Sequence, residues 1–183
     1  MKGDRFIILY FWSDPHFSHK NVIQYCNRPY KDIIEMNDKL IENFKNKVSI
    51  SNDNHIFILG DIWNPEPLSN LTEYDMSLIL GNHDRPCKSL NKIKEVINKY
   101  NLNITIYKYP IIIEKYIILS HEPIEGLNKH SFFLNICGHM HNSILLNDKT
   151  WNEGNRYYNA CVEMNNMAPV SLDEIITKLE IER

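Results

Sequence analysis

The sequence predicts an α/β protein in which apolar strands alternate with amphipathic helices. Strand-length apolar runs recur along the 183 residues, and residues at helical spacing lie between several of them. Most of these runs are continuous rather than alternating, which indicates sheets that are covered on both faces. Because no linker interrupts the pattern, we expect residues 1–183 to form a single domain with a sizeable core.

The expected elements follow one another in a regular order. Strands are predicted at residues 6–13, 55–60, 76–81, 104–108, 110–120, 132–138 and 156–162. One helix is indicated by the spacing of Ile33, Met36, Leu40, Ile41, Phe44 and Val48, and a second by Leu90, Ile93, Val96, Ile97 and Tyr100. The capping box "SLDE" at 171–174 opens a last helix. This order is typical of α/β architecture with the sheet at its centre.

Composition excludes several classes of protein. The net charge is −3, with 20 basic and 23 acidic residues, so no strong signal for nucleic-acid binding is present. The four cysteines form no CxxC pair and no signal peptide precedes them, so we expect reduced thiols in a cytoplasmic protein. No apolar run reaches the roughly 20 residues that span a bilayer. Nothing in the sequence indicates an oligomeric state.

Polar clusters follow five of the predicted strands. They read "SDPH" at 13–16, "GD" at 60–61, "GNHD" at 81–84, "SH" at 120–121 and "GHMH" at 138–141. Open α/β sheets place their sites at the carboxyl ends of the strands, so these clusters could meet at one edge. A glycine before three of them lets the backbone leave the strand in a tight turn.

The side chains of these clusters form a set of metal ligands. The set is Asp14, His16, Asp61, Asn82, His121, His139 and His141. Oxygen and imidazole donors without thiolate suit Mn²⁺, Fe or Zn²⁺ better than Ca²⁺. Seven ligands are too many for one ion, but they suit two ions that share a bridging carboxylate.

The order D-x-H, GD, GNHD, H, GHxH across residues 14–141 resembles the calcineurin-like metallophosphoesterase superfamily. The stretch "DPHFSHKNVIQYCNRPY" further resembles small phage and bacterial members. The resemblance implies a four-layer α/β/β/α sandwich of two mixed sheets. It also implies two divalent metal ions, Mn²⁺ first, with Fe, Zn²⁺ or Ni²⁺ as alternatives.

The same resemblance assigns roles to the residues. The first ion would take Asp14, His16, Asp61 and His141, and the second Asp61, Asn82, His121 and His139, with Asp61 bridging. The implied reaction is hydrolysis of a phosphate ester by a hydroxide held between the ions. His83 would act as the general acid toward the leaving group, and Asp84 would orient His83. An open site with this acid favours a phosphodiesterase, for which a nucleotide is one candidate substrate.

Three alternatives remain open at this stage. The chain could be a scaffold that has kept the fold and lost catalysis, although every expected ligand is present. It could be a metal-dependent nuclease, which should display a positive groove. His19 and Arg28 flank the first cluster and could contact a substrate phosphate; alternatively, Arg28 pairs with a surface carboxylate and His19 begins a helix.

Overall fold

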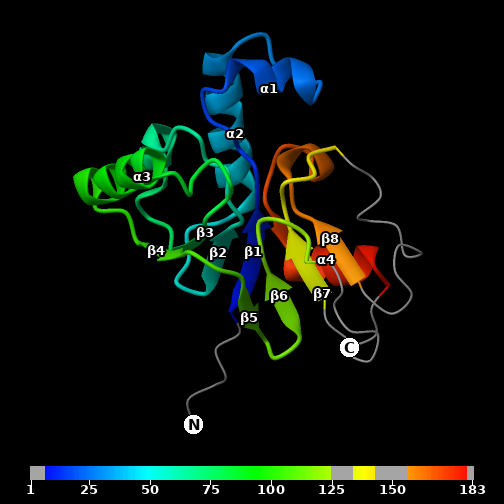
Figure 1. Ribbon diagram of the computed structural model, residues 1–183. Helices are drawn as coiled ribbons and strands as arrows, with labels where there is room; N and C mark the ends of the chain where they lie inside the picture. The colour runs from blue at the N-terminus through cyan, green and yellow to red at the C-terminus, as the bar shows by residue number, and fades with distance from the viewer. Residues whose placement is uncertain (1–6, 125–133, 143–155, 181–183) are drawn as a thin grey trace.

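Two mixed sheets with flanking helices form the structure, a computed structural model that describes residues 7–124, 134–142 and 156–180 (Figure 1). The larger sheet has the strand order β4-β3-β2-β1-β9 and the smaller has the order β5-β6-β7-β8. In the first, β1 to β4 are parallel and β9 is antiparallel; in the second, β5 is antiparallel and the others are parallel. The predicted fold class is therefore confirmed.

The elements lie close to the predicted ranges. The strands of the larger sheet are β1 (Ile8–Trp12), β2 (Asn54–Ile58), β3 (Met76–Ile79), β4 (Ile104–Tyr107) and β9 (Val170–Ser171). Those of the smaller sheet are β5 (Ile111–Ile113), β6 (Ile117–Leu119), β7 (Leu134–Cys137) and β8 (Arg156–Asn159). The helices are α1 (Lys20–Tyr25), α2 (Ile33–Lys47), α3 (Cys87–Tyr100), α4 (Leu172–Lys178) and the short 3₁₀ turns η1 (Glu66–Leu71) and η3 (Val162–Met164).

One predicted strand is wrong. Residues 110–120 form a hairpin of β5 and β6 in place of a single strand, because Glu114 and Lys115 turn the chain with φ angles of 48° and 65°. The turn contains no glycine or asparagine, which are the usual residues for positive φ, so its sequence gave no signal. The helices α1 and η1 and the strand β9 are additions to the prediction.

The helices begin where their capping residues permit. Asp32 accepts hydrogen bonds from the backbone of Ile34 and Glu35 at the start of α2. Ser171 and Glu174 form the predicted capping box of α4. Both starts follow from side chains that satisfy amide groups left free in the first helical turn.

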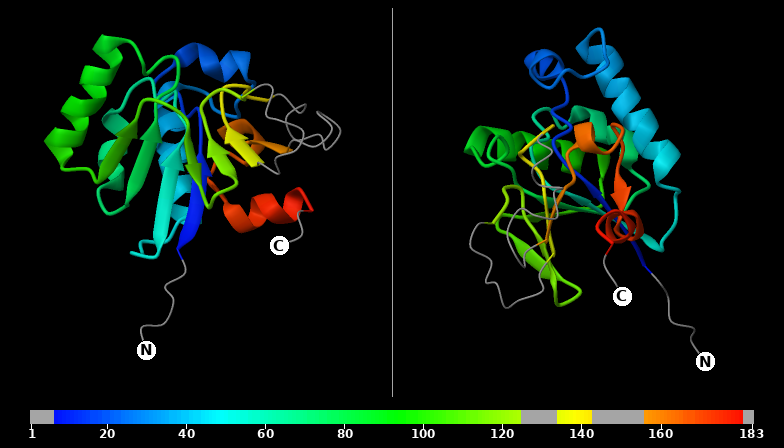
Figure 2. Two further views of the ribbon diagram at one scale, coloured as in Figure 1. Left: turned by 60° about the horizontal axis from the view of Figure 1, so that its bottom comes forward. Right: turned by 90° about the vertical axis from the view of Figure 1, so that its right-hand side faces the viewer.

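Two apolar layers hold the sheets and helices together. On one face of the larger sheet, Trp12, Ile56 and Leu78 pack against α2 and α3. On its other face, Phe11 and Phe57 meet Ile136 of the smaller sheet, and α4 packs at this inter-sheet layer through Ile175 and its neighbours. Figure 2 shows α2 and the smaller sheet on opposite sides of the larger one. Both faces are largely apolar, although buried polar residues such as Ser77 of β3 and Asn135 of β7 also lie within the strands.

Candidate metal centre

The structure brings the predicted ligands together at the carboxyl ends of the strands. The parallel strands β1, β2 and β3 end at one edge, and β6 and β7 end beside them. Two groups of potential ligands result, each with donor atoms within 4.8 Å of one another: Asp14, His16 and His141, and Asp61, His121 and His139. Each group is part of one of the two sets expected for a first and a second ion, without Asp61 in the first and without Asn82 in the second.

In the first group, which we call the first triad, the side chains of Asp14 and His16 are buried and that of His141 is 26% exposed. The Nε2 atom of His16 lies 3.6 Å from Asp14 Oδ1 and also 3.6 Å from Asp61 Oδ2. The Nε2 atom of His141 lies 3.9 Å from the same Asp14 oxygen. These separations are too long for hydrogen bonds, and the donor atoms of the triad all lie within 4.8 Å of one another.

Several atoms of the first triad lack any hydrogen-bond partner. They are Asp14 Oδ1 and both ring nitrogens of His16, and all three are buried. The other Asp14 oxygen is fully engaged, because it accepts from Ser13 Oγ, from the backbone amide of His139 and from Cys161 Sγ. Burying unpaired polar atoms is costly, and a divalent cation would satisfy Asp14 Oδ1 and His16 Nε2 together. The residues therefore fit a metal ion.

The second group, which we call the second triad, contains Asp61 itself. The Nε2 atom of His121 is 3.4 Å from Asp61 Oδ2, and His139 Nδ1 is 3.3 Å from His121 Nε2. The amide oxygen of Asn82 is 2.9 Å from His121 Nε2 and 3.2 Å from His139 Nδ1. Because Asp61 lies within reach of both triads, it stands where a bridging carboxylate would be needed.

The ligand loops have an unusual backbone. Five of the seven candidate ligands have positive φ: Asp14 (56°), His16 (47°), Asp61 (54°), His139 (69°) and His141 (45°). Residues other than glycine rarely adopt this conformation, and such strain concentrates at functional sites. The loops also pass very close to one another. A Cβ atom on Gly81 would lie 2.1 Å from Asp61 Oδ1, so a glycine is required there.

Electrostatics favour the charged forms of Asp14 and Asp61 and the protonated forms of His121 and His141. Burial works against charge on His121, but the hydrogen bond with Asp61 and the charge of Asp14 raise the pKa of His121 to about 9. The pKa of His141 is raised to about 10, against its burial, by contacts with Cys26 and Glu163 and by the charge of Asp14. For Asp61, the interaction with His121 outweighs burial and lowers the pKa. The donors thus compensate one another in place of a metal ion.

Asp84 does not have the role that was predicted for it. Its side chain is fully buried, and its Oδ2 accepts from the backbone amides of Asp61 (2.6 Å) and Gly81 (3.1 Å), while Oδ1 accepts from the amide of Ile62 (3.0 Å). Burial, followed by the charge of Asp61, raises the pKa of this carboxyl. Both oxygens are therefore occupied by backbone, and Asp84 holds the GD and GNHD loops together instead of orienting His83.

Arg28 likewise faces inward. Its side chain is buried and donates to the carbonyl oxygens of Asp14 and Pro15, both at 2.7 Å, and to Glu163. These contacts contradict the predicted contact of Arg28 with a substrate phosphate. The alternative of a carboxylate partner is met only in part, because Glu163 is buried and does not lie at the surface. Glu163 was missed by the sequence analysis, because nothing near it in the chain marks it as part of the site.

His19, His83 and Trp63 stand at the mouth of the site. His83 has a side chain that is 46% exposed, with Nε2 3.9 Å from Asp61 Oδ2. The ring of Trp63 lies between the other two, with centroid distances of 4.1 Å to His19 and 5.1 Å to His83. His19 is also the N-cap residue of α1, as the alternative expected. Burial, aided by the neighbouring charges of His16 and His83, lowers its pKa, so at neutral pH it offers an uncharged ring to a ligand.

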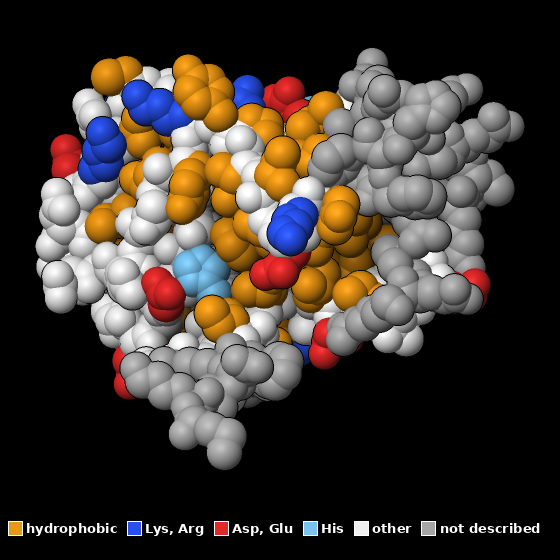
Figure 3. Space-filling model, turned by 90° about the horizontal axis from the view of Figure 1, so that it is seen from below, with side chains coloured by type: hydrophobic (Ala, Val, Ile, Leu, Met, Phe, Trp, Pro, Cys, Tyr) orange, Lys and Arg blue, Asp and Glu red, His pale blue; other side chains and the backbone are white. Residues whose placement is uncertain are grey.

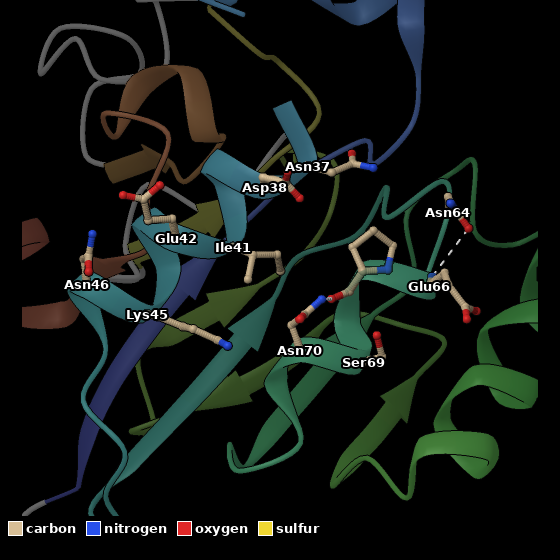
Figure 4. A pocket seen from close by; sticks show the side chains of 11 residues that line it. Asn37, Asp38, Ile41, Glu42, Lys45, Asn46, Asn64, Glu66, Ser69 and Asn70 are labelled. Carbon is tan, nitrogen blue, oxygen red and sulfur yellow. Dashed lines mark hydrogen bonds between the residues drawn. The ribbon is translucent and has the colours of Figure 1, made fainter. Parts of the chain in front are cut away.

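The described surface also has a hollow near the loop after β1. A groove of about 640 Å³ runs between α2 and η1, and its walls carry amides and acidic groups (Figure 4). Two of its amides, Asn37 and Asn64, both donate to Ser18 Oγ, which joins the groove to the loop after β1.

On the face seen from below in Figure 3, basic and acidic side chains lie scattered among hydrophobic ones. In the described parts of the chain, no helix is long and apolar enough to cross a membrane.

The comparisons with known proteins place the chain among uncharacterized relatives. No family model matches it. The uncharacterized protein MJ1445 of Methanocaldococcus jannaschii is 31% identical over 179 residues, which cover 94% of this chain and 91% of that protein.

Two solved structures resemble the present one to different degrees. The protein AQ665 of Aquifex aeolicus has a TM-score of 0.64 at 24% identity, over 93% of this chain and 98% of that one, and so shares the fold. The nuclease MPE of Pseudomonas putida gives a TM-score of 0.42 at 19% identity, over 73% of this chain and 61% of its own.

Proposed function

We propose that the protein is a phosphodiesterase that depends on two divalent metal ions. The chain belongs to one family with the MJ1445 protein of Methanocaldococcus jannaschii. The observation that carries the proposal is the pair of triads that meet at Asp61, with buried and unpartnered donor atoms on Asp14 and His16. The order of the five motif blocks supports membership of the calcineurin-like metallophosphoesterase superfamily, among its small phage and bacterial-type members.

The candidate ligands divide as the two triads do. Asp14, His16 and His141 would hold one ion, and His121, His139 and Asn82 the other, with Asp61 between them. When bound, the ions would supply a Lewis acid for the phosphoryl oxygens and lower the pKa of the attacking water. Oxygen and imidazole donors favour Mn²⁺, with Fe, Zn²⁺ or Ni²⁺ as alternatives.

His83 supplies the proton for the leaving group in this proposal. Its backbone amide donates to Asp61 Oδ1 at 3.0 Å, which fixes the residue beside the ions, while its exposed ring faces the mouth of the site. A leaving alkoxide needs a proton far more than a leaving nitrophenolate does, so a general acid matters most for esters of ordinary alcohols. Asp84 contributes by holding the backbone that carries His83.

The inward position of Arg28 supports a diester as substrate. A phosphate monoester carries a second negative charge, which phosphatases commonly bind with a guanidinium fork. Arg28 spends its donors on Glu163 and on two backbone carbonyls and so offers none to a substrate. A diester has a single anionic charge and needs fewer positively charged groups from the protein.

The test compares two esters with one enzyme. Metal-stripped protein is assayed with added Mn²⁺ on bis(p-nitrophenyl) phosphate and on p-nitrophenyl phosphate, beside the Asp61→Asn variant. Asp38→Asn, which alters an exposed carboxylate of α2, serves as the matched control, and circular dichroism verifies folding. The proposal expects metal-dependent turnover, faster on the diester, that Asp61→Asn abolishes and Asp38→Asn retains. A folded protein that cleaves neither ester with Mn²⁺, Fe²⁺, Zn²⁺ or Ni²⁺ would favour the scaffold function instead.

A further inference from the structure

A buried ion pair lies directly behind the first triad. The guanidinium of Arg28 approaches Glu163 Oε1 through Nη2 at 2.7 Å and Nε at 2.9 Å. The two side chains are 0% and 3% exposed. Both charges have been removed from water, and a pair of this kind is weak evidence for a stabilising role, since apolar residues often serve stability as well. Its position therefore calls for another explanation.

The pair joins the two loops that supply the first triad. On one side, Arg28 donates to the carbonyl oxygens of Asp14 and Pro15, which lie in the loop after β1. On the other side, Glu163 Oε1 lies 3.1 Å from Nδ1 of His141, which follows β7. Asp14 and His141 are far apart in the sequence, and the pair bridges them through five polar contacts.

The contact with Glu163 also decides which nitrogen of His141 can bind an ion. When Nδ1 carries a proton donated to the carboxylate, Nε2 keeps the free lone pair. The structure places that Nε2 on the side of Asp14 Oδ1, at 3.9 Å. The orientation of the ring and the tautomer thus agree with binding at the first triad.

A competing use of the same residues is a third ion. Cys26, His141 and Glu163 have donor atoms close enough to hold a cation, and Glu163 Oε2 is buried without a hydrogen-bond partner. However, the guanidinium of Arg28 already occupies Oε1 of that carboxylate and would repel a cation at close range. The charge of Arg28 therefore favours a positioning role for Glu163 over a ligand role.

We propose that Arg28 and Glu163 are positioning residues that set the affinity of the first triad for its metal ion. Glu163 fixes the ring of His141, and Arg28 fixes Glu163 together with the backbone of Asp14. The inference rests on the proposed two-ion site, but its test measures ion binding and not turnover. Carboxylates behind metal-binding histidines commonly change metal affinity about 10- to 100-fold when they are replaced.

The experiment titrates metal-free protein with Mn²⁺ and follows the free ion by electron paramagnetic resonance. Wild-type protein is compared with Glu163→Gln and with Glu66→Gln, a matched control that alters an exposed pair with Lys99. Each change is also made in a His139→Ala background, which retains only the first triad, and in a His16→Ala background, which retains only the second. We expect Glu163→Gln to weaken one ion about 10- to 100-fold in the wild-type and His139→Ala backgrounds and to change nothing in the His16→Ala background.

The outcomes separate the inference from the proposed function. Wild-type protein that binds no Mn²⁺ would count against the metal site itself, and with it the inference. Equal loss of affinity in both backgrounds, or none in either, would overturn the positioning role while the two-ion site stands. A third ion that Cys26→Ser removes would overturn it in favour of a ligand role.

A spectroscopic measurement covers the case in which Glu163→Gln does not fold. The wild-type protein is loaded with Zn²⁺, which is diamagnetic, and the imidazole nitrogens are observed by nuclear magnetic resonance. A proton on Nδ1 of His141 with Nε2 bound is expected. A spectrum with the proton on Nε2 would overturn the inference.

Discussion

Replacing Asp84 tests whether it holds the backbone or assists His83. Asp84→Ala removes the acceptor of three buried amides, those of Asp61, Ile62 and Gly81. A buried amide without an acceptor costs about 1–3 kcal/mol. Part of this cost is offset, because the variant no longer buries a carboxylate whose pKa is raised by its surroundings. We therefore expect the free energy of unfolding to fall by about 3–6 kcal/mol.

Asp84→Asn should fall between the wild type and the alanine variant. Its amide oxygen still accepts a hydrogen bond, but its NH₂ group meets a backbone amide that also donates, so a loss of about 1–2 kcal/mol is expected. The assay is urea unfolding of the metal-free proteins, with Asp38→Ala as a surface control that should change stability by less than about 0.5 kcal/mol. Unchanged stability in Asp84→Ala would refute the reasoning. The refutation would be clearest if the activity of Asp84→Ala fell as far as that of His83→Ala and the double variant Asp84→Ala/His83→Ala lost no further activity.

Three further predictions concern the site directly. His83→Ala should lose about 10²- to 10⁴-fold more activity on an alkyl phosphodiester than on a nitrophenyl one; equal losses on both would exclude a general acid. Because the pKa values of His121 and His141 are raised to about 9 and about 10, both rings are protonated at pH 7, and Mn²⁺ must displace their protons. Calorimetry in two buffers of different ionisation enthalpy should therefore detect proton release, and Mn²⁺ affinity should rise with pH up to about 10. Without metal, the protonated rings stabilise the fold below pH 6.5, and this stabilisation should disappear as the pH rises through about 9 to 10. Gly81→Ala should displace Asp61, because Asp61 Oδ1 would be 2.1 Å from the new Cβ. We expect it to abolish Mn²⁺ binding in the titration followed by electron paramagnetic resonance. Unchanged binding would show that the loop can move to make room for the Cβ atom.

The positions of the ligands could be predicted because they depend on a rule about whole strands. Parallel strands end at the same edge of a sheet, so a polar residue directly after each apolar run belongs to one site. Asp14, Asp61 and Asn82 follow β1, β2 and β3 in this way. No side-chain contact had to be known for this inference.

The conformation of the ligand loops could not be predicted in the same way. Five candidate ligands adopt positive φ although none of them is glycine, and the hairpin turn at Glu114 and Lys115 does so as well. Local sequence favours other conformations at these positions. At Asp61 a contact from a distant part of the chain, the carboxylate of Asp84, acts against this preference. The turn between β5 and β6 was missed because it contains neither glycine nor asparagine.

The roles that Arg28 and Asp84 have in the structure share one physical cause. Each is a charged residue beside a motif; the sequence analysis placed Asp84 against His83 and left Arg28 between a substrate phosphate and a surface carboxylate. In the structure each is buried and binds backbone: Asp84 accepts from three amides, and Arg28 donates to two carbonyl oxygens.

Backbone strain in the loops that carry the candidate ligands explains why buried charged groups hold the backbone there. Hydrogen bonds to a charged group are roughly twice as strong as those between neutral groups, and one carboxylate or guanidinium can engage several backbone atoms. Asp61 and Asp14, the residues held in this way, have positive φ angles of 54° and 56°. The charges of Asp84 and Arg28 therefore act against backbone strain at two carboxylates of the candidate ion sites, and this role leaves no trace in the spacing of the motifs.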